Sequence, residues 1–269
     1  MPSPGGGDWA RGTGHGALGS LLLPLTLFVA VYLAVFVGLG TFVDPQWAGL
    51  IAVIAATAFT VRIVEGARWR LGFFVPPRFA LRDFVLGVGF AAALILVTDA
   101  LVTATSNLRQ TFAGGFPRAE LITVFIPAAF HEELAFRGYL FQKIRTWSRG
   151  GAIAITSMVF ALLHAGNRGV TAMAIANLVL AGVLLALAYE RFQRLWFPIG
   201  IHLAWNIFSG PVLGFGVSGY VASATLFRTS GGGPGWITGG AFGIEGSVWM
   251  ALVELGGIFL LSRRLEGLS

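Results

Sequence analysis

A short polar stretch interrupts a chain that otherwise carries few charges. Residues 130–145 read FHEELAFRGYLFQKIR and contain Glu132, Glu133 and Arg137. On a helix, Glu133 and Arg137 lie four residues apart, so they share a face and can form an ion pair. Glu132 points about 100° further round the same helix. This second carboxylate therefore needs partners from other parts of the chain.

Two later segments contain polar side chains with a four-residue spacing. Phe160 and His164 lie in FALLHAGN, and His202 and Asn206 lie in HLAWN. A carboxylate beside a neutral imidazole can take a proton from water. A second imidazole and an amide can stabilise the oxyanion that forms on an attacked carbonyl group. Together these residue types predict hydrolysis of an amide without a serine or cysteine nucleophile.

A metal site is the alternative chemistry for the same residues. Two histidines and one carboxylate form a known set of catalytic zinc ligands, and Glu132, His164 and His202 would supply it. The segment HEELA resembles the start of the zinc-binding motif H-E-x-x-H, but its fifth residue is Ala135. We therefore expect His131 to be a bystander rather than a ligand, and the alternative is that it supports the site residues from behind.

Composition indicates that lipid surrounds most of the chain. Of its 269 residues, 56% are hydrophobic and 11% are charged, whereas an average soluble domain has about 25% charged residues. The absence of cysteine excludes disulfides, thiolate zinc sites and a cysteine nucleophile. The net charge is +6, but the basic residues lie between apolar segments. We therefore expect membrane lipid as a partner and no nucleic acid.

Regularly spaced apolar segments must position the polar residues. A membrane-spanning helix needs about 20 mostly apolar residues, and backbone groups in hydrocarbon must be satisfied internally. The sequence therefore predicts an all-α, polytopic membrane helical bundle of about eight transmembrane helices. These are expected at residues 17–43, 47–66, 84–105, 119–142, 151–166, 170–189, 195–215 and 246–262.

The basic residues are distributed unequally between the two sides of this bundle. The side that holds both termini has 13 of them: Arg11, Arg62, Arg68, Arg70, Arg78, Arg82, Lys143, Arg145, Arg149, Arg191, Arg194, Arg263 and Arg264. The opposite side has four: Arg109, Arg118, Arg168 and Arg228. Because cytoplasmic loops carry the excess of Lys and Arg, we predict cytoplasmic termini. We expect an integral protein of a bacterial plasma membrane.

The same segments suggest how the chain is divided. Residues 1–16 are rich in glycine and proline and are expected to form a disordered tail. Residues 17–83 would form two helices and a cytoplasmic loop, 84–262 the functional domain, and 263–269 a cytoplasmic tail. The glycine-rich connection at 229–246 is typical of a flexible linker or a lid.

In combination, the three motifs resemble those of the CPBP family, also called the CAAX protease and bacteriocin-processing (Abi) family of intramembrane proteases. The resemblance is carried by E-E-x-x-x-R at Glu132, Glu133 and Arg137, by F-x-x-x-H at Phe160 and His164, and by H-x-x-x-N at His202 and Asn206. It covers residues 84–262 and implies an eight-helix endopeptidase that cleaves a membrane-associated protein or peptide. It also implies that Glu132 and His164 activate water and that His202 and Asn206 stabilise the oxyanion.

The resemblance further implies that Glu133, Arg137 and Phe160 orient the site. The family has been described both as metalloproteases and as glutamate-dependent proteases. We prefer a CAAX-type, glutamate-dependent enzyme without a cofactor, because Asn206 and its polar neighbours suit an oxyanion hole. A divalent metal such as zinc is the alternative. The motifs do not specify whether the substrate is prenylated.

Two other functions are weighed against proteolysis. One is a non-catalytic membrane scaffold or a bacteriocin-immunity protein of the same family. The other is an ion-coupled transporter that uses Glu132, Asp99 and Glu254 as a relay, because acids at membrane depth mark ion pathways. Asp99 and Glu254 lack a spaced partner, so we expect them to be local structural groups that face cavities.

Overall fold

The computed structural model of the protein describes residues 14–66 and 71–263. Residues 1–13 of the expected tail, 67–70, and 264–269 of the expected carboxyl-terminal tail lie outside the described residues. The first helix begins at Gly14, so it includes the last residues of the range expected as a tail.

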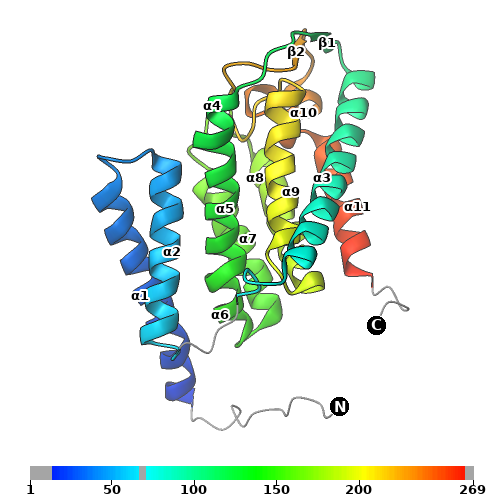
Figure 1. The fold of residues 1–269 in the computed structure, drawn as a ribbon. Helices are drawn as coiled ribbons and strands as arrows, with labels where there is room; N and C mark the ends of the chain where they lie inside the picture. The colour runs from blue at the N-terminus through cyan, green and yellow to red at the C-terminus, as the bar shows by residue number, and fades with distance from the viewer. Residues whose placement is uncertain (1–13, 67–70, 264–269) are drawn as a thin grey trace.

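The described residues form an all-α bundle, as the sequence predicts (Figure 1). Each expected span corresponds to a helical run. The helices are α1 (Gly14–Leu39), α2 (Pro45–Ile63), α3 (Pro77–Thr105), α4 (Arg118–Glu120), α5 (Ile126–Glu133), α6 (Phe141–Arg145), α7 (Arg149–Leu163), α8 (Ala172–Phe192), α9 (Trp196–Ile207), α10 (Gly235–Thr238) and α11 (Val248–Ser262). Among the described residues, α1, α2, α3 and α8 are long and apolar enough to cross a membrane alone. The count of eight spans stays a prediction.

Side-chain caps fix where several helices begin. Asp44 accepts a hydrogen bond from the Gln46 amide at the start of α2. Ser148, Thr171 and Ser247 cap α7, α8 and α11 in the same way. Such caps satisfy amide groups that the first turn of a helix leaves without partners.

One long helical run passes through the centre of the bundle. It joins α4, α5 and α6 without a break, through π-helical segments at Leu121–Phe125 and Leu134–Leu140. Glu132 and Glu133 are the last two residues of α5. They therefore lie directly before the second π-helical segment, a kind of irregularity that occurs often at functional sites.

Small residues allow two helices to approach closely beside this run. A Cβ atom at Gly87 of α3 would lie 2.3 Å from the Phe197 carbonyl oxygen, and one at Gly200 of α9 would lie 2.4 Å from that of Phe84. Side chains larger than glycine would separate α3 from α9. Close contacts of this kind are typical of helix packing in membranes, and here they hold α9, which carries His202 and Asn206.

His131 connects the amino-terminal helices to the central run. Its Nε2 atom lies 2.8 Å from the Tyr32 hydroxyl of α1, and the two rings stack with their centroids 5.7 Å apart. A Cβ atom at Gly49 of α2 would lie 2.6 Å from the imidazole. His131 therefore occupies the interface of three helices.

The connections at one end of the bundle form a compact layer (Figure 1). Strands β1 (Arg109–Phe112) and β2 (Phe227–Ser230) pair antiparallel. The glycine-rich connection at 229–246 is folded: it continues from β2 through α10 into two short 3-10 turns. Gly243 has φ of 107°, and a Cβ atom there would lie 1.9 Å from the Gly216 carbonyl oxygen. Only glycine fits this contact.

Candidate active site

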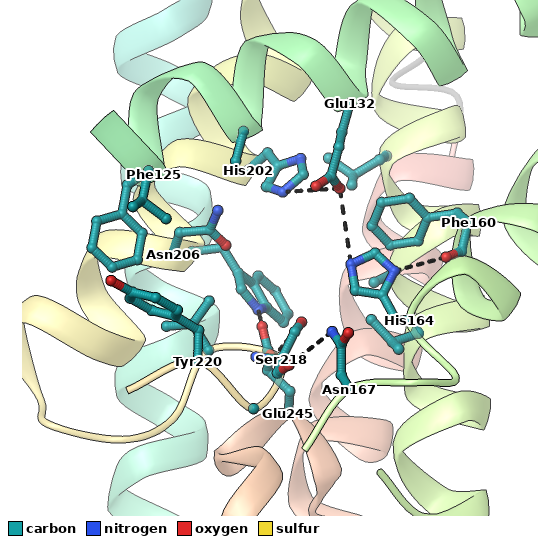
Figure 2. Close-up of a pocket in the computed structure, with 18 of the residues that line it drawn as sticks. Phe125, Glu132, Phe160, His164, Asn167, His202, Asn206, Ser218, Tyr220 and Glu245 are labelled. Carbon is teal, nitrogen blue, oxygen red and sulfur yellow. Dashed lines mark hydrogen bonds and ion pairs between the residues drawn. The ribbon is translucent and has the colours of Figure 1, made fainter. Parts of the chain in front are cut away.

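The three predicted motifs converge on one cavity of about 350 Å³. Glu132 comes from α5, His164 follows α7, and His202 and Asn206 come from α9. Figure 2 shows these side chains around the cavity, together with residues of the loop at 217–220. Segments more than 70 residues apart in the chain therefore contribute to one site.

Behind His202 lies a buried ion pair of Glu133 and Arg137. We call these three residues the inner wall, and of the three His202 lines the cavity itself. The Arg137 Nη1 atom donates to Glu133 Oε1 at 3.0 Å, and both side chains are fully buried. His202 Nδ1 lies 2.8 Å from the same carboxylate oxygen. Arg137 Nη2 also donates to the carbonyl of Gly182 on α8 at 3.1 Å. The predicted Glu133–Arg137 pair thus links the helix of His202 to the central run, while Glu133 Oε2 and Arg137 Nε have no hydrogen-bond partner among the described residues.

The aromatic ring of Phe160 supports this wall. The Arg137 guanidinium lies 5.0 Å from the centre of the ring, a favourable distance for a cation above an aromatic face. The same ring contacts His164 at 4.8 Å and His202 at 6.2 Å between centroids. Phe160 therefore packs against both imidazole rings and restricts their movement.

The hydrogen bonds of the two imidazoles indicate their tautomers. His164 Nδ1 lies 2.8 Å from the Phe160 carbonyl oxygen, which can only accept, so this nitrogen carries the proton. His202 Nδ1 in turn faces the Glu133 carboxylate. The Nε2 atom of the neutral His164 ring is then a free acceptor, whereas Nε2 of His202 accepts in the neutral ring and donates in the imidazolium. Both Nε2 atoms face Glu132.

Glu132 differs from its neighbour in lacking a hydrogen-bond partner. Its Oε2 atom lies 4.0 Å from His164 Nε2 and 3.8 Å from His202 Nε2. These distances exceed a direct hydrogen bond but match polar groups that a water molecule bridges. Within the described chain, Glu132 Oε2 is buried and has no hydrogen-bond partner. Glu132 therefore presents an unused acceptor to the cavity.

The outer wall consists of Trp205, Ser218 and Glu245. Glu245 is buried, with its Oε1 atom accepting from the Trp205 indole at 2.8 Å. Its Oε2 atom accepts from the amide and the hydroxyl of Ser218. Asn167 donates to the Ser218 carbonyl at 2.9 Å, and Ser218 has φ of 47°. The Glu245 carboxylate thus holds a left-handed residue in the loop that borders the cavity.

The sequence motifs do not include Glu245, which the structure places in the lining of the cavity. Burial raises the pKa of this carboxyl group, although hydrogen bonds from Ser218 and Trp205 and the nearby His164 lower it. The available signal was one acid in GIEG, within a segment otherwise rich in glycine. That signal does not indicate partners, because Ser218 and Trp205 precede Glu245 by 27 and 40 residues.

The two other membrane acids lie apart from the cavity. Asp99 accepts from the Gln110 amide at 2.9 Å. Glu254 is 1% exposed, and its Oε2 atom has no hydrogen-bond partner among the described residues. Neither acid lines the cavity.

In the described arrangement, Glu132 Oε2 lies further from the two imidazole nitrogens than the ligand atoms of a bound zinc ion lie from one another. Ligand atoms around tetrahedral zinc are about 3.3 Å apart, whereas Glu132 Oε2 lies 3.8 and 4.0 Å from the two Nε2 atoms. Over residues 14–66 and 71–263, no group of three or more His, Cys, Asp or Glu side chains has the arrangement of a metal site. The donor types are nevertheless those of a zinc site, with each imidazole hydrogen-bonded through Nδ1 as ligand histidines usually are.

Comparison with known families identifies the same part of the chain. A family model described as type II CAAX prenyl endopeptidase Rce1-like matches residues 114–208. No curated protein matches the chain. The matched range contains all three motifs and the inner wall, and it ends before Ser218 and Glu245. Together with the long apolar helices, the match indicates an integral membrane protein. Over residues 114–208 the chain matches the Rce1-like CAAX endopeptidase family, which agrees with the resemblance that its three motifs carry.

Proposed function

We propose that this protein is an intramembrane endopeptidase that hydrolyses a peptide bond of a membrane-associated protein or peptide. The observation that carries the proposal is the gap between Glu132 Oε2 and the two Nε2 atoms of His164 and His202. Glu132 Oε2 and His164 Nε2 are two acceptors beside one water-sized gap and are suited to hold and deprotonate water. The match to a CAAX endopeptidase family supports this assignment.

In the proposed first step, a water molecule in the gap donates one hydrogen to Glu132 and the other to His164 Nε2. Its lone pairs are then free to attack the carbonyl carbon of the substrate. As the new C–O bond forms, Glu132 takes the proton. Water is thereby activated without a covalent intermediate on the enzyme.

In the same step the carbonyl oxygen becomes an oxyanion. The Asn206 amide, one helical turn from His202 on α9, is proposed as one donor to it. His202 is the other, and it must then be an imidazolium, because its Nδ1 proton is already given to Glu133. The Glu133 carboxylate balances the positive charge of that ring.

Collapse of this intermediate completes the reaction. The C–N bond breaks, Glu132 returns its proton to the departing nitrogen, and an acid and an amine are formed. Glu133, Arg137 and Phe160 do not contact the reacting atoms. Their proposed role is to hold the imidazoles so that both Nε2 atoms face Glu132.

We propose that catalysis requires no metal, and a divalent ion such as zinc remains the competing mechanism. The transporter alternative loses support, because Asp99 and Glu254 do not line the cavity with Glu132. A non-catalytic scaffold would not depend on the free carboxylate of Glu132. Substitution of Glu132 therefore distinguishes a scaffold from an enzyme.

The test compares membrane proteomes of cells that express the wild-type protein, Glu132→Ala or Glu190→Ala. Glu190 pairs with Arg145 and Arg149 outside the cavity, so its variant is the control for loss of a carboxylate. We expect uncut proteins to accumulate only with Glu132→Ala, at an equal amount of folded protein. Equal cleavage by purified Glu132→Ala and wild-type protein would rule out the proposed mechanism.

A further inference from the structure

The two ends of the helical bundle differ in their content of basic residues. One end contains the α2–α3, α6–α7 and α8–α9 connections and the end of α11 (Figure 1). The described basic residues there are Arg62, Arg78, Arg82, Lys143, Arg145, Arg149, Arg191, Arg194 and Arg263. The opposite end has Arg109, Arg118, Arg168 and Arg228. We refer to these as the basic end and the opposite end.

Among the described residues, the lining of the cavity reaches the surface at the opposite end. Its rim includes Gln46 at the start of α2, Arg168 beyond α7, and Tyr220 in the loop after α9. Arg168 is exposed, and Tyr220 is 40% exposed. His164 itself is the residue that caps the carboxyl end of α7. The polar groups of the site are therefore close to this surface.

Towards the basic end the cavity is closed. Among the described residues, its lining includes no part of 62–83, 141–153 or 189–199, the segments that carry most of the charge of the basic end. The buried pair of Glu133 and Arg137 fills the space on that side of Glu132. A substrate has no described path to Glu132 from the basic end.

Basic residues near the ends of membrane spans mark the cytoplasmic side. We propose that substrate enters this site from the non-cytoplasmic face. Its substrate class is then a membrane-anchored polypeptide with the scissile bond on that side, not a lipidated carboxyl-terminal tail in the cytoplasm. That a substrate enters the cavity rests on the proposed function. The face of the membrane to which the cavity opens does not depend on catalysis.

The absence of cysteine in this chain permits a direct test. Gly150 and Gly166 lie near the two ends of α7, at the basic end and beside the cavity rim. Both are exposed, and a Cβ atom at either would meet nothing within 4 Å. Gly150→Cys and Gly166→Cys are therefore a matched pair of single-cysteine variants.

Intact cells that express either variant are treated with a membrane-impermeant maleimide, and a second sample is treated after permeabilisation. We expect Gly166→Cys to be labelled in intact cells and Gly150→Cys only after permeabilisation. Labelling of Gly150→Cys in intact cells overturns the proposal. So does a Gly166 thiol that reacts only after permeabilisation.

A second measurement connects this direction to the substrate. Intact cells that express Gly166→Cys are labelled with a bulky impermeant maleimide. The amounts of the uncut proteins that accumulate with Glu132→Ala are then measured in these cells. We expect the same proteins to accumulate in the labelled Gly166→Cys cells. Cells that express the wild-type protein, whose chain has no cysteine, should show no accumulation after the same treatment. Processing that continues despite complete labelling overturns entry at this rim. If Glu132→Ala itself causes no accumulation, the proposed function fails while the labelling result still decides the direction of the cavity.

Discussion

The inner and outer walls of the cavity each centre on a buried carboxylate, but they compensate its charge in different ways. Glu133 in the inner wall pairs with the Arg137 guanidinium and His202. Glu245 in the outer wall accepts only from neutral groups, the Trp205 indole and Ser218. Glu132 lies between these walls without a hydrogen-bond partner in the described chain.

This comparison indicates a division of roles. The inner wall is an ion pair that joins α5, the following π-helical segment and α9, so it fixes the positions of the groups that we propose to be catalytic. The outer wall is a hydrogen-bonded loop anchor, so it shapes the entrance of the cavity. The carboxylate without a partner is the one that we propose to react. Adjacent carboxylates with different surroundings commonly divide structural and catalytic roles in this way.

Removing the guanidinium should have the largest effect on stability. Arg137→Ala leaves the Glu133 carboxylate buried without its cation, which typically costs about 3–5 kcal/mol. Unfolding of the purified protein in detergent measures this change. Arg145→Ala is the control, because the Arg145 side chain is 37% exposed in its pair with Glu190 and such pairs contribute about 0–1 kcal/mol. Equal losses in the two variants would contradict the role of the inner wall.

Asn206 tests the proposed oxyanion site with a smaller expected effect. Asn206→Ala should lower kcat by about 100-fold to 1,000-fold, the usual effect of losing one oxyanion donor. KM should change little. Cleavage by the purified variant, with a substrate from the membrane comparison, measures both constants. Asn206→Asp keeps the shape of the side chain but removes the donor, so it should lose at least as much. A kcat within twofold of wild type in either variant would exclude this role.

Glu245 should show a pH dependence that distinguishes the outer wall. Because burial raises the pKa of Glu245 above its unfolded value, the folded protein binds more protons than the unfolded chain between those two values. Its contribution to stability is therefore greatest at low pH and is lost as pH rises through the folded pKa. Glu245→Gln removes this dependence.

The free energy of unfolding should accordingly fall less steeply with rising pH in Glu245→Gln than in wild type. At low pH the two proteins should differ little, because protonated Glu245 and glutamine each have one carbonyl oxygen for the donors of Ser218 and Trp205. As pH rises, the wild-type protein should lose stability relative to the variant. Thermal unfolding of both proteins at about pH 4 to pH 8 measures this pH dependence of stability. The range covers ordinary carboxyl and imidazole pKa values. Parallel pH profiles would contradict the assignment.

Removal of metal should have the smallest effect. Dialysis of the purified wild-type protein against a chelator is expected to leave the cleavage rate unchanged, and metal analysis should find no stoichiometric zinc. Zinc bound at one ion per chain and lost in His164→Ala would contradict the metal-free mechanism. It would assign Glu132, His164 and His202 as ligands instead.

The inner wall was open to prediction from sequence, and the outer wall was not. Spacing alone indicates the pair of Glu133 and Arg137, because four residues return a helix to the same face. The apolar segments similarly predict the helices, since their length and composition are local properties. The proximity of Glu132, His164 and His202 follows from the motifs through the family resemblance. In the structure the three residues line one cavity.

The outer wall depends on contacts that no local pattern encodes. Glu245 reaches Ser218 and Trp205 because glycines such as Gly243 let the loops pass at van der Waals distance. The glycine-rich composition that we associated with a linker or a lid is here the condition for close packing. The π-helical segments on either side of α5 also left no recognisable signal in the sequence.

The most direct test of the account is the cleavage rate of purified Glu132→Gln. This substitution keeps the size of the side chain but removes the proposed base, so kcat should fall by about 100-fold to 10,000-fold while the unfolding temperature stays close to that of wild type. Cleavage at the wild-type rate by a folded Glu132→Gln protein would contradict the claim that the unpaired carboxylate between the two walls activates water.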